Sequence, residues 1–158
     1  MTPLVFRLPK GFCLDFLNIS QVIVECIKKN DWNIVDKEFQ ALTSPGGQIY
    51  QHLLSYIQFN NIEYMISIRD SENEWEEDGI WHDDGSRVLA FSLSLTLNSH
   101  ELEGGHLGIR KKGEVEYQKI LTPEIGNMIV FLTGVHGFEH KIHAVTKGRR
   151  IMLVGWCS

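Results

Sequence analysis

The sequence lacks a long apolar run, and it has few cysteines. Its longest apolar stretches, such as MIVFL, are far too short to cross a bilayer, and its first residues show no signal-peptide run. The three cysteines are widely spaced and form no CxxC pair, which favours free thiols in a reducing compartment over a disulfide framework. We therefore expect a cytoplasmic protein with no membrane partner.

An excess of basic charge is also missing. The 158 residues carry a formal net charge of −5, whereas broad binding to nucleic acid needs a basic face. A local basic patch lies within residues 141–150, but we expect no nucleic-acid partner. No Ser/His/Asp or Cys/His constellation stands out, and no glycine-rich phosphate loop occurs.

The length suits one domain with a real hydrophobic core. The first third of the chain is predicted to be helical after a short strand at residues 4–8. Apolar spacing predicts a helix over residues 20–29, with Ser20 as N-cap and Val22, Ile23, Cys26 and Ile27 on one face. A second helix is predicted over residues 47–59.

From residue 62 onward the pattern changes to short β-rich runs separated by Gly, Asn, Lys or Pro. Strands at this spacing without intervening helices indicate a sandwich or barrel. The predicted strands are EYMISIR, SRVLAFSLSLTLN, GGHLGIRK, EVEYQKIL, GNMIVFL, EHKIHAVT and RRIMLVGW.

Two places in the sequence suggest chemistry. In His82-Asp83-Asp84, positions i and i+2 of an extended backbone point to one side, so His82 and Asp84 can reach one metal ion. A further His would complete the two-His, one-carboxylate set of non-haem Fe(II) oxygenases. The plainer interpretation is a strand-end His beside a solvated acidic turn. Arg150 would share a strand face with apolar residues, where a guanidinium needs an anionic partner.

From Trp81 to the C-terminus, the chain resembles the 2-oxoglutarate/Fe(II)-dependent dioxygenases, particularly their prolyl hydroxylase-like branch. The resemblance rests on four motifs in order: HDD at residues 82–84, LN at 97–98 followed by GGHL at 104–107, HKIHAVTKGRR at 140–150, and Trp156. It implies a mainly β fold with N-terminal helices and a double-stranded β-helix (jelly roll) core. Residues 1–158 would then be one domain, in which residues 1–60 support a core of residues 61–158.

Carried over by position, the resemblance makes His82, Asp84 and His140 the iron ligands. Arg150 would hold the distal carboxylate of 2-oxoglutarate, and Leu107 would form an apolar wall. Thr96 stands where relatives often have a Tyr that binds the same carboxylate. Arg69 falls near another cosubstrate-contacting position.

The implied activity is a hydroxylase that uses Fe(II), 2-oxoglutarate and O2, with ascorbate as reductant and with succinate and CO2 as products. The substrate is an unidentified protein residue, prolyl or other, or a small molecule. Two alternatives stay open: a metal-dependent cupin-like isomerase or lyase, and a non-catalytic jelly-roll binding module. Neither needs a cation at Arg150.

The remaining histidines and acids have weaker cases. His143 is expected to point away from His140 on a strand, and Asp83 away from Asp84. His100 and His106 are expected to be solvated at a hairpin, and zinc at the helical spacing of His136 and His140 is conceivable. The acidic segment of residues 71–78 is interpreted either as a disordered surface loop or as a segment that closes over the substrate. Its negative charge is also expected to steer a basic substrate.

Overall fold

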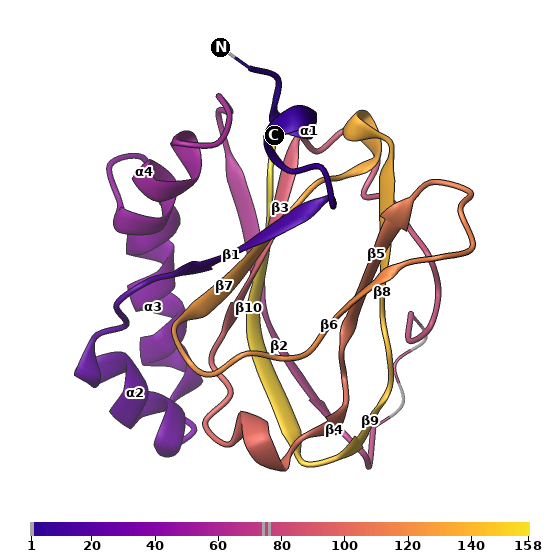
Figure 1. Ribbon diagram of the computed structural model, residues 1–158. Coiled ribbons are helices and arrows are strands. Elements are labelled where there is room, and N and C mark those ends of the chain that lie inside the picture. The colour runs from indigo at the N-terminus through magenta and orange to yellow at the C-terminus, as the bar shows by residue number, and fades with distance from the viewer. Residues whose placement is uncertain (1, 74, 76) are drawn as a thin grey trace.

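The computed structural model describes residues 2–73, 75 and 77–158. Short helices lie at one side of a mainly antiparallel β structure, and the two chain ends lie at the same end of the molecule (Figure 1). The helices are α1 (Leu4–Arg7), α2 (Gln21–Lys28), α3 (Trp32–Thr43) and α4 (Gln48–Leu54), with single 3-10 turns η1 (Ser99–Glu101) and η2 (Gly134–His136). None of the helices in the described part of the chain is long and apolar enough to cross a membrane.

The strands form three antiparallel groups. A five-stranded sheet has the order β1-β7-β3-β10-β2, a three-stranded sheet has the order β6-β5-β8, and β4 pairs with β9. The strands are β1 (Phe12–Phe16), β2 (Ile62–Asp70), β3 (Leu89–Ser94), β4 (Glu103–Gly104), β5 (Leu107–Lys111), β6 (Gln118–Ile120), β7 (Asn127–Phe131), β8 (Phe138–Ile142), β9 (Val145–Lys147) and β10 (Arg149–Cys157).

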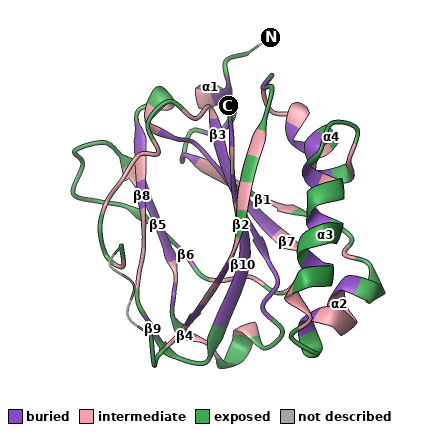
Figure 2. Ribbon diagram, turned by 180° about the vertical axis from the view of Figure 1, so that it is seen from behind, coloured by how far each residue is buried: buried purple, intermediate pink, exposed green. Residues whose placement is uncertain are grey.

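Helices α2, α3 and α4 cover the outer face of the five-stranded sheet and present their exposed residues away from it (Figure 2). Helix α2 begins as predicted, because the Ser20 hydroxyl accepts a hydrogen bond from the Ile23 N–H at 3.4 Å. Ile23 and Ile27 are buried, but Val22 is 59% exposed. The expectation for Val22 was wrong because an eight-residue helix buries a narrow stripe, and consecutive residues lie about 100° apart on it.

The first residues differ from the prediction. Residues 4–8 were expected to form a strand, but α1 is a single helical turn in which the Pro3 carbonyl accepts hydrogen bonds from Phe6 and Arg7. The strand of this region is β1, which pairs with β7 at the edge of the five-stranded sheet. The first sixty residues therefore contribute a strand as well as helices.

Helix α3 was not predicted at all, and α4 is shorter than predicted, because its last helical residue is Leu54. Val35 and Phe39 of α3 are fully buried, one helical turn apart. The predicted strand at residues 139–146 is divided between β8 and β9, so residues 143–144 lie in neither strand.

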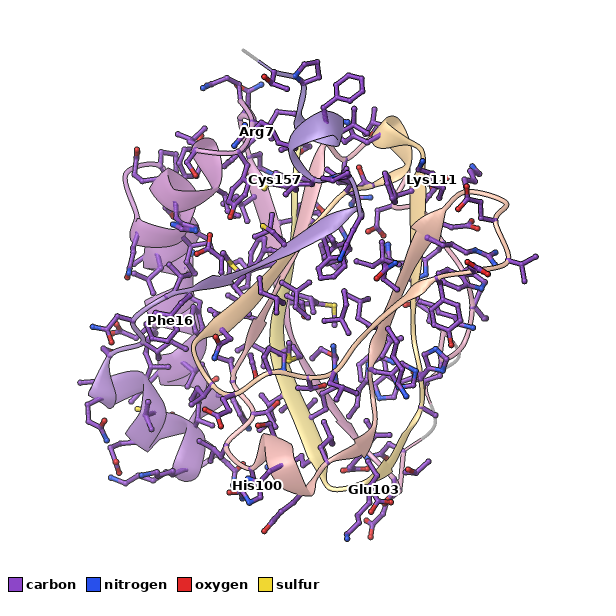
Figure 3. The ribbon with its side chains drawn as sticks, in the orientation of Figure 1. Arg7, Phe16, His100, Glu103, Lys111 and Cys157 are labelled. Atoms are coloured by element: carbon purple, nitrogen blue, oxygen red, sulfur yellow. The ribbon has the colours of Figure 1, made fainter. Side chains whose placement is uncertain are left out.

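The two larger sheets face each other, and side chains fill the space between them (Figure 3). The register of β2, β10 and β3 aligns the residues of one sheet face in rungs, each about 7 Å from the next along the strands. The rungs are Glu63–Trp156–Ala90, Met65–Val154–Ser92, Ser67–Met152–Ser94 and Arg69–Arg150. The number of rungs between two site residues gives their separation along the strands.

Candidate metal centre and cosubstrate cavity

His82 and His140 come from distant parts of the chain and are joined by their backbones. The His82 N–H donates to the His140 carbonyl at 2.9 Å, and the His140 N–H donates to the His82 carbonyl at 2.8 Å. Their rings lie 4.2 Å apart between centroids. This isolated bridge extends the edge of β8 by one residue pair and brings two imidazoles to one place.

Asp84 joins them through a turn. Its φ is +62°, in the left-handed region, and Gly85 after it has φ +61°. The expectation of an extended backbone from His82 to Asp84 was therefore wrong, although the two side chains still converge. The Nε2 of His82 lies 3.7 Å from Asp84 Oδ1, and the Nε2 of His140 lies 3.3 Å from Asp84 Oδ2.

His82, Asp84 and His140 form one cluster, in which one ligand atom from each residue lies within 4.8 Å of the others. Burial lowers the pKa of His140 to about 3, with His82 as a second cause, so this imidazole is neutral at neutral pH and offers a lone pair. The Nδ1 of His82 lies 3.1 Å from the Ile80 carbonyl, which can only accept, so Nδ1 carries the proton and Nε2 is free to bind a metal.

The carboxylate is placed to suit a cation. Burial raises the pKa of Asp84, against smaller opposing effects of Trp156, His82 and Arg87. Its Oδ2 atom is buried without a hydrogen-bond partner among the described residues. A desolvated carboxylate oxygen beside two imidazole nitrogens fits a divalent cation bound by two His and one carboxylate.

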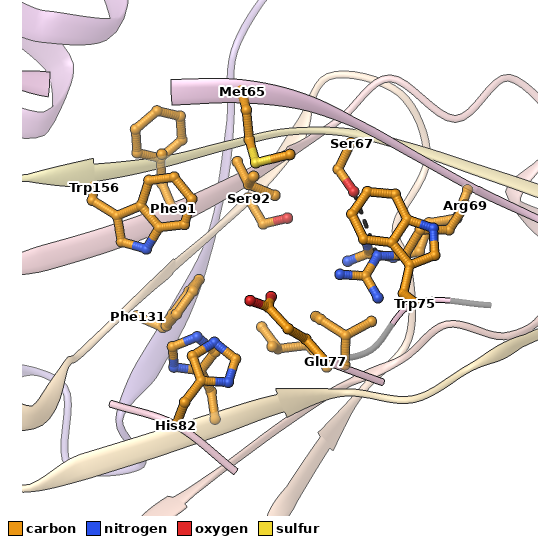
Figure 4. Close-up of a pocket in the computed structure, with 16 residues that line it drawn as sticks. Met65, Ser67, Arg69, Trp75, Glu77, His82, Phe91, Ser92, Phe131 and Trp156 are labelled. Atoms are coloured by element: carbon orange, nitrogen blue, oxygen red, sulfur yellow. Dashed lines mark hydrogen bonds between the residues drawn. The ribbon is translucent and has the colours of Figure 1, made fainter. Parts of the chain in front are cut away.

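A cavity of about 90 Å³ opens beside the two histidines, several times the space that one water needs (Figure 4). Its walls come from both facing sheets and from the segment before His82. The lining residues are Met65, Ser67, Arg69, Trp75, Glu77, His82, Phe91, Ser92, Leu107, Phe131, His140, Ile142, Arg150, Val154, Gly155 and Trp156.

Arg150 lies in this cavity and is only 1% exposed. Its Nε donates to the Thr122 hydroxyl at 3.2 Å, and its guanidinium forms no ion pair within residues 2–73, 75 and 77–158. Burial lowers its pKa to about 9, with Arg69 as a second cause. The neighbouring Arg149 points the other way: it is exposed and donates to Asn30 Oδ1 at 2.9 Å.

Arg69 lines the same cavity, in the rung of Arg150. It forms an ion pair with Asp78, and its guanidinium lies 4.2 Å from the ring centre of Trp75. Burial lowers the pKa of Arg69, and the nearby Asp78 and Glu77 oppose that effect. Asp78 is therefore not a solvated loop acid, and Arg69 connects the acidic segment to the cavity wall.

The other two predicted cosubstrate residues differ in position. Leu107, 1% exposed on β5, lines the cavity. Thr96 is buried outside the cavity lining, and its hydroxyl donates to the Ile151 carbonyl at 2.9 Å. The structure thus brings Leu107, but not Thr96, to the cavity.

The neighbours of the predicted ligands point elsewhere, as expected. Asp83 pairs with Lys112 at 2.8 Å, outside the cluster. The His143 ring stacks on His106 at 3.7 Å, so His106 is not simply solvated.

Two further histidines, His136 and His100, take no part in the cluster. His136 lies 3.0 Å from the Val88 carbonyl through its Nε2. His100 is exposed on η1, at the end of the molecule opposite the two termini (Figure 3).

Several residues that line the cavity were not predicted from the sequence. Phe131 packs its ring 4.8 Å from that of His140, and Met65 and Ser92 occupy the rung of Val154. Alternation along the predicted strands indicates which residues share a face. It could not show which of the two faces meets the metal ligands, because that depends on how the sheets pair.

Comparison with known families agrees with this geometry. The model described as the 2OG-Fe(II) oxygenase superfamily matches residues 66–158, which is more than half of the chain. The chain belongs to this superfamily, which uses Fe(II) and 2-oxoglutarate. Comparison with curated protein sequences finds no match.

Solved structures of prolyl hydroxylases share the fold at low sequence identity. A Pseudomonas putida prolyl-4-hydroxylase is 17% identical, with 98% of this chain and 92% of that chain covered and a TM-score of 0.59. A Trichoplax adhaerens prolyl hydroxylase, solved with a hypoxia inducible factor peptide fragment, is 13% identical, with 98% and 86% covered and a TM-score of 0.57. A Phytophthora capsici prolyl 4-hydroxylase is 11% identical, with 97% and 60% covered and a TM-score of 0.61.

Proposed function

We propose that the protein is a 2-oxoglutarate- and Fe(II)-dependent dioxygenase with hydroxylase activity. His82, Asp84 and His140 would hold the iron, and Arg150 would bind the distal carboxylate of 2-oxoglutarate. One observation carries the proposal: a single cavity has a two-His, one-carboxylate cluster at one place and a buried guanidinium without an ion-pair partner, among the described residues, at another.

The residues around the cluster have definable tasks. When bound, Fe(II) would supply O2 activation and oxidation of a substrate C–H bond, coupled to conversion of 2-oxoglutarate to succinate and CO2. Arg150 orients the dicarboxylate, because a guanidinium matches two carboxylate oxygens. Leu107 provides an apolar wall, and Phe131 packs against the His140 imidazole and limits its contact with water. Arg69 is the second cation near the cosubstrate.

The substrate is proposed by class. A prolyl or other protein residue is favoured by the fold shared with prolyl hydroxylases, one of which was solved with a peptide fragment. A small molecule is the second possibility. The facing antiparallel sheets support a double-stranded β-helix core formed by residues 61–158 of a single domain, with residues 1–60 supporting it. The proposed compartment is the cytoplasm.

Release of succinate tests this function. The protein with Fe(II), ascorbate and 2-oxoglutarate under air should form succinate, and a suitable peptide or metabolite should accelerate it. The matched control is Asp84→Asn, which keeps the fold but removes the carboxylate ligand. A metal-dependent isomerase or lyase, or a binding module, would form no succinate with any substrate in a broad screen.

A further inference from the structure

One hydroxyl of the cavity wall has no hydrogen-bond partner among the described residues. Ser92 on β3 is 3% exposed, and its Oγ makes no hydrogen bond to the described residues. Nearby buried hydroxyls differ: Ser94 donates to the Pro123 carbonyl at 2.7 Å, and Ser67 accepts from Arg69 Nε at 3.4 Å. A buried hydroxyl without a protein partner is destabilising, and a bound ligand that accepts its hydrogen bond would remove that cost.

The position of Ser92 shows why the protein cannot satisfy it. Its cross-strand neighbours are Val154 on β10 and Ile129 on β7, and Met65 follows in the same rung. All three side chains are apolar, so the flanking strands provide no acceptor or donor. Figure 4 shows the Ser92 hydroxyl pointing into the cavity.

Ser92 also lies between the two chemical ends of the cavity. The next rung in one direction holds Trp156, near Phe131 and the imidazole of His140. Arg150 lies two rungs away in the other direction, and its long side chain reaches back into the cavity. A dicarboxylate that extends from Arg150 to the metal ligands would run along the cavity wall that carries Ser92.

We propose that Ser92 is a further cosubstrate-binding residue, whose hydroxyl donates a hydrogen bond to a carboxylate oxygen at the metal end of 2-oxoglutarate. The inference rests on the proposed function and adds a residue to it. A carboxylate oxygen is a strong acceptor, and a hydrogen bond to a charged group in a dry cavity is stronger than one between neutral groups.

The test compares 2-oxoglutarate binding with ligand-free stability. Mn(II) replaces Fe(II) to prevent turnover, and calorimetry measures the affinity of the parent, Ser92→Ala and Ser92→Thr. Ser92→Ala should bind 2-oxoglutarate about tenfold to a hundredfold more weakly. Ser92→Thr keeps the hydroxyl and should recover most of the affinity. Without ligand, Ser92→Ala should unfold at the same temperature as the parent or higher, because it removes an unpaired buried hydroxyl.

Ser94→Ala is the matched control on the same strand. It removes a hydroxyl bonded to the protein, so it should lower ligand-free stability and leave 2-oxoglutarate affinity unchanged. Equal affinity of parent and Ser92→Ala would overturn the role of Ser92 while the proposed function stands. A lower melting temperature of ligand-free Ser92→Ala would overturn it too, since the hydroxyl would then have a protein partner. A metal-loaded parent that does not bind 2-oxoglutarate would overturn both proposals.

Discussion

His82 and His140 exchange both of their backbone hydrogen bonds, at 2.9 Å and 2.8 Å, so each proposed ligand locates the other. The pairing fixes the main chain on both sides of the cluster before any ion binds. Asp84 then reaches the imidazoles from a left-handed turn. The cluster is thus set by backbone geometry as much as by side-chain packing.

The first prediction concerns metal binding. Asp84→Asn should largely lose a divalent ion, because it removes the anionic ligand, whereas Asp83→Asn should keep it, because Asp83 pairs with Lys112 outside the cluster. Calorimetric titration of Mn(II) into each variant measures this difference. The reverse order of the two affinities would mean that the wrong aspartate has been assigned.

The second prediction concerns the ion pair of Arg69 and Asp78. Both side chains are nearly buried, at 9% and 14% exposure, so Asp78→Ala leaves a guanidinium unpaired in the cavity wall. We expect a loss of about 3 kcal/mol in the free energy of unfolding, measured by denaturant titration. Glu72→Ala, at an exposed position of the same segment, should change it by less than about 0.5 kcal/mol. Similar values for both variants would refute the buried pair.

The acidic segment gives a third prediction. Glu72 and Glu77 are exposed, and Glu77 also lines the cavity, with its carboxylate turned toward it in Figure 4. Glu74 and Glu76 lie outside the described residues, and Asp78 is paired with Arg69. Steering of a basic substrate therefore remains a prediction that rests mainly on Glu72 and Glu77.

Replacing both Glu72 and Glu77 by Gln should slow the association of a lysine-rich test peptide, most strongly at low salt, where charges are least screened. Stopped-flow measurement at several ionic strengths checks this. Association rates equal to those of the parent at every ionic strength would contradict electrostatic steering by Glu72 and Glu77.

The stacked pair of His106 and His143 gives a prediction on pH. Burial, together with His143, Lys119 and Lys141, lowers the pKa of His106 from 6.5 to about 4. Between pH 6.5 and 4, the His106 imidazole binds a proton in the unfolded state but stays neutral in the folded state. The contribution of His106 to stability is therefore complete above pH 6.5 and is lost as the pH falls toward 4.

Ring-proton NMR titration measures this directly, and His106→Gln identifies the resonance by its loss. The midpoint should lie near 4. The same variant should depend less steeply on pH in thermal unfolding between pH 6.5 and 4. A midpoint near 6.5 would contradict the half-buried stack of His106 and His143.

The sequence predicted most strands because their apolar runs are bounded by clear turn residues. β2 and β10 both form where their patterns indicate. The prediction failed where the local secondary-structure preference of the residues and their tertiary packing favour different structures. Residues 4–8 are β-rich in composition but form a helical turn, and α3 was missed although Val35 and Phe39 are buried one turn apart.

For the site, the family resemblance predicted the three metal ligands, and the structure corrected the predicted backbone conformation between His82 and Asp84. His82 and Asp84 converge, but through positive φ at Asp84 and not along a strand. Local spacing cannot predict such a turn. Ser92 and the Arg69–Asp78 pair were also beyond the sequence, because each depends on contacts between segments far apart in the chain.

Arg150 is the residue on which the proposed function depends most directly. In the metal-loaded protein, calorimetry should show 2-oxoglutarate binding to the parent and a loss of roughly 2–5 kcal/mol in Arg150→Ala, or on the order of thirtyfold to several-thousandfold in affinity. Arg149→Ala is the matched control, because its exposed side chain points away and bonds Asn30. It should bind 2-oxoglutarate nearly as the parent does. If Arg150→Ala bound 2-oxoglutarate as tightly as the parent, the assignment of Arg150 to the distal carboxylate of the cosubstrate would be wrong.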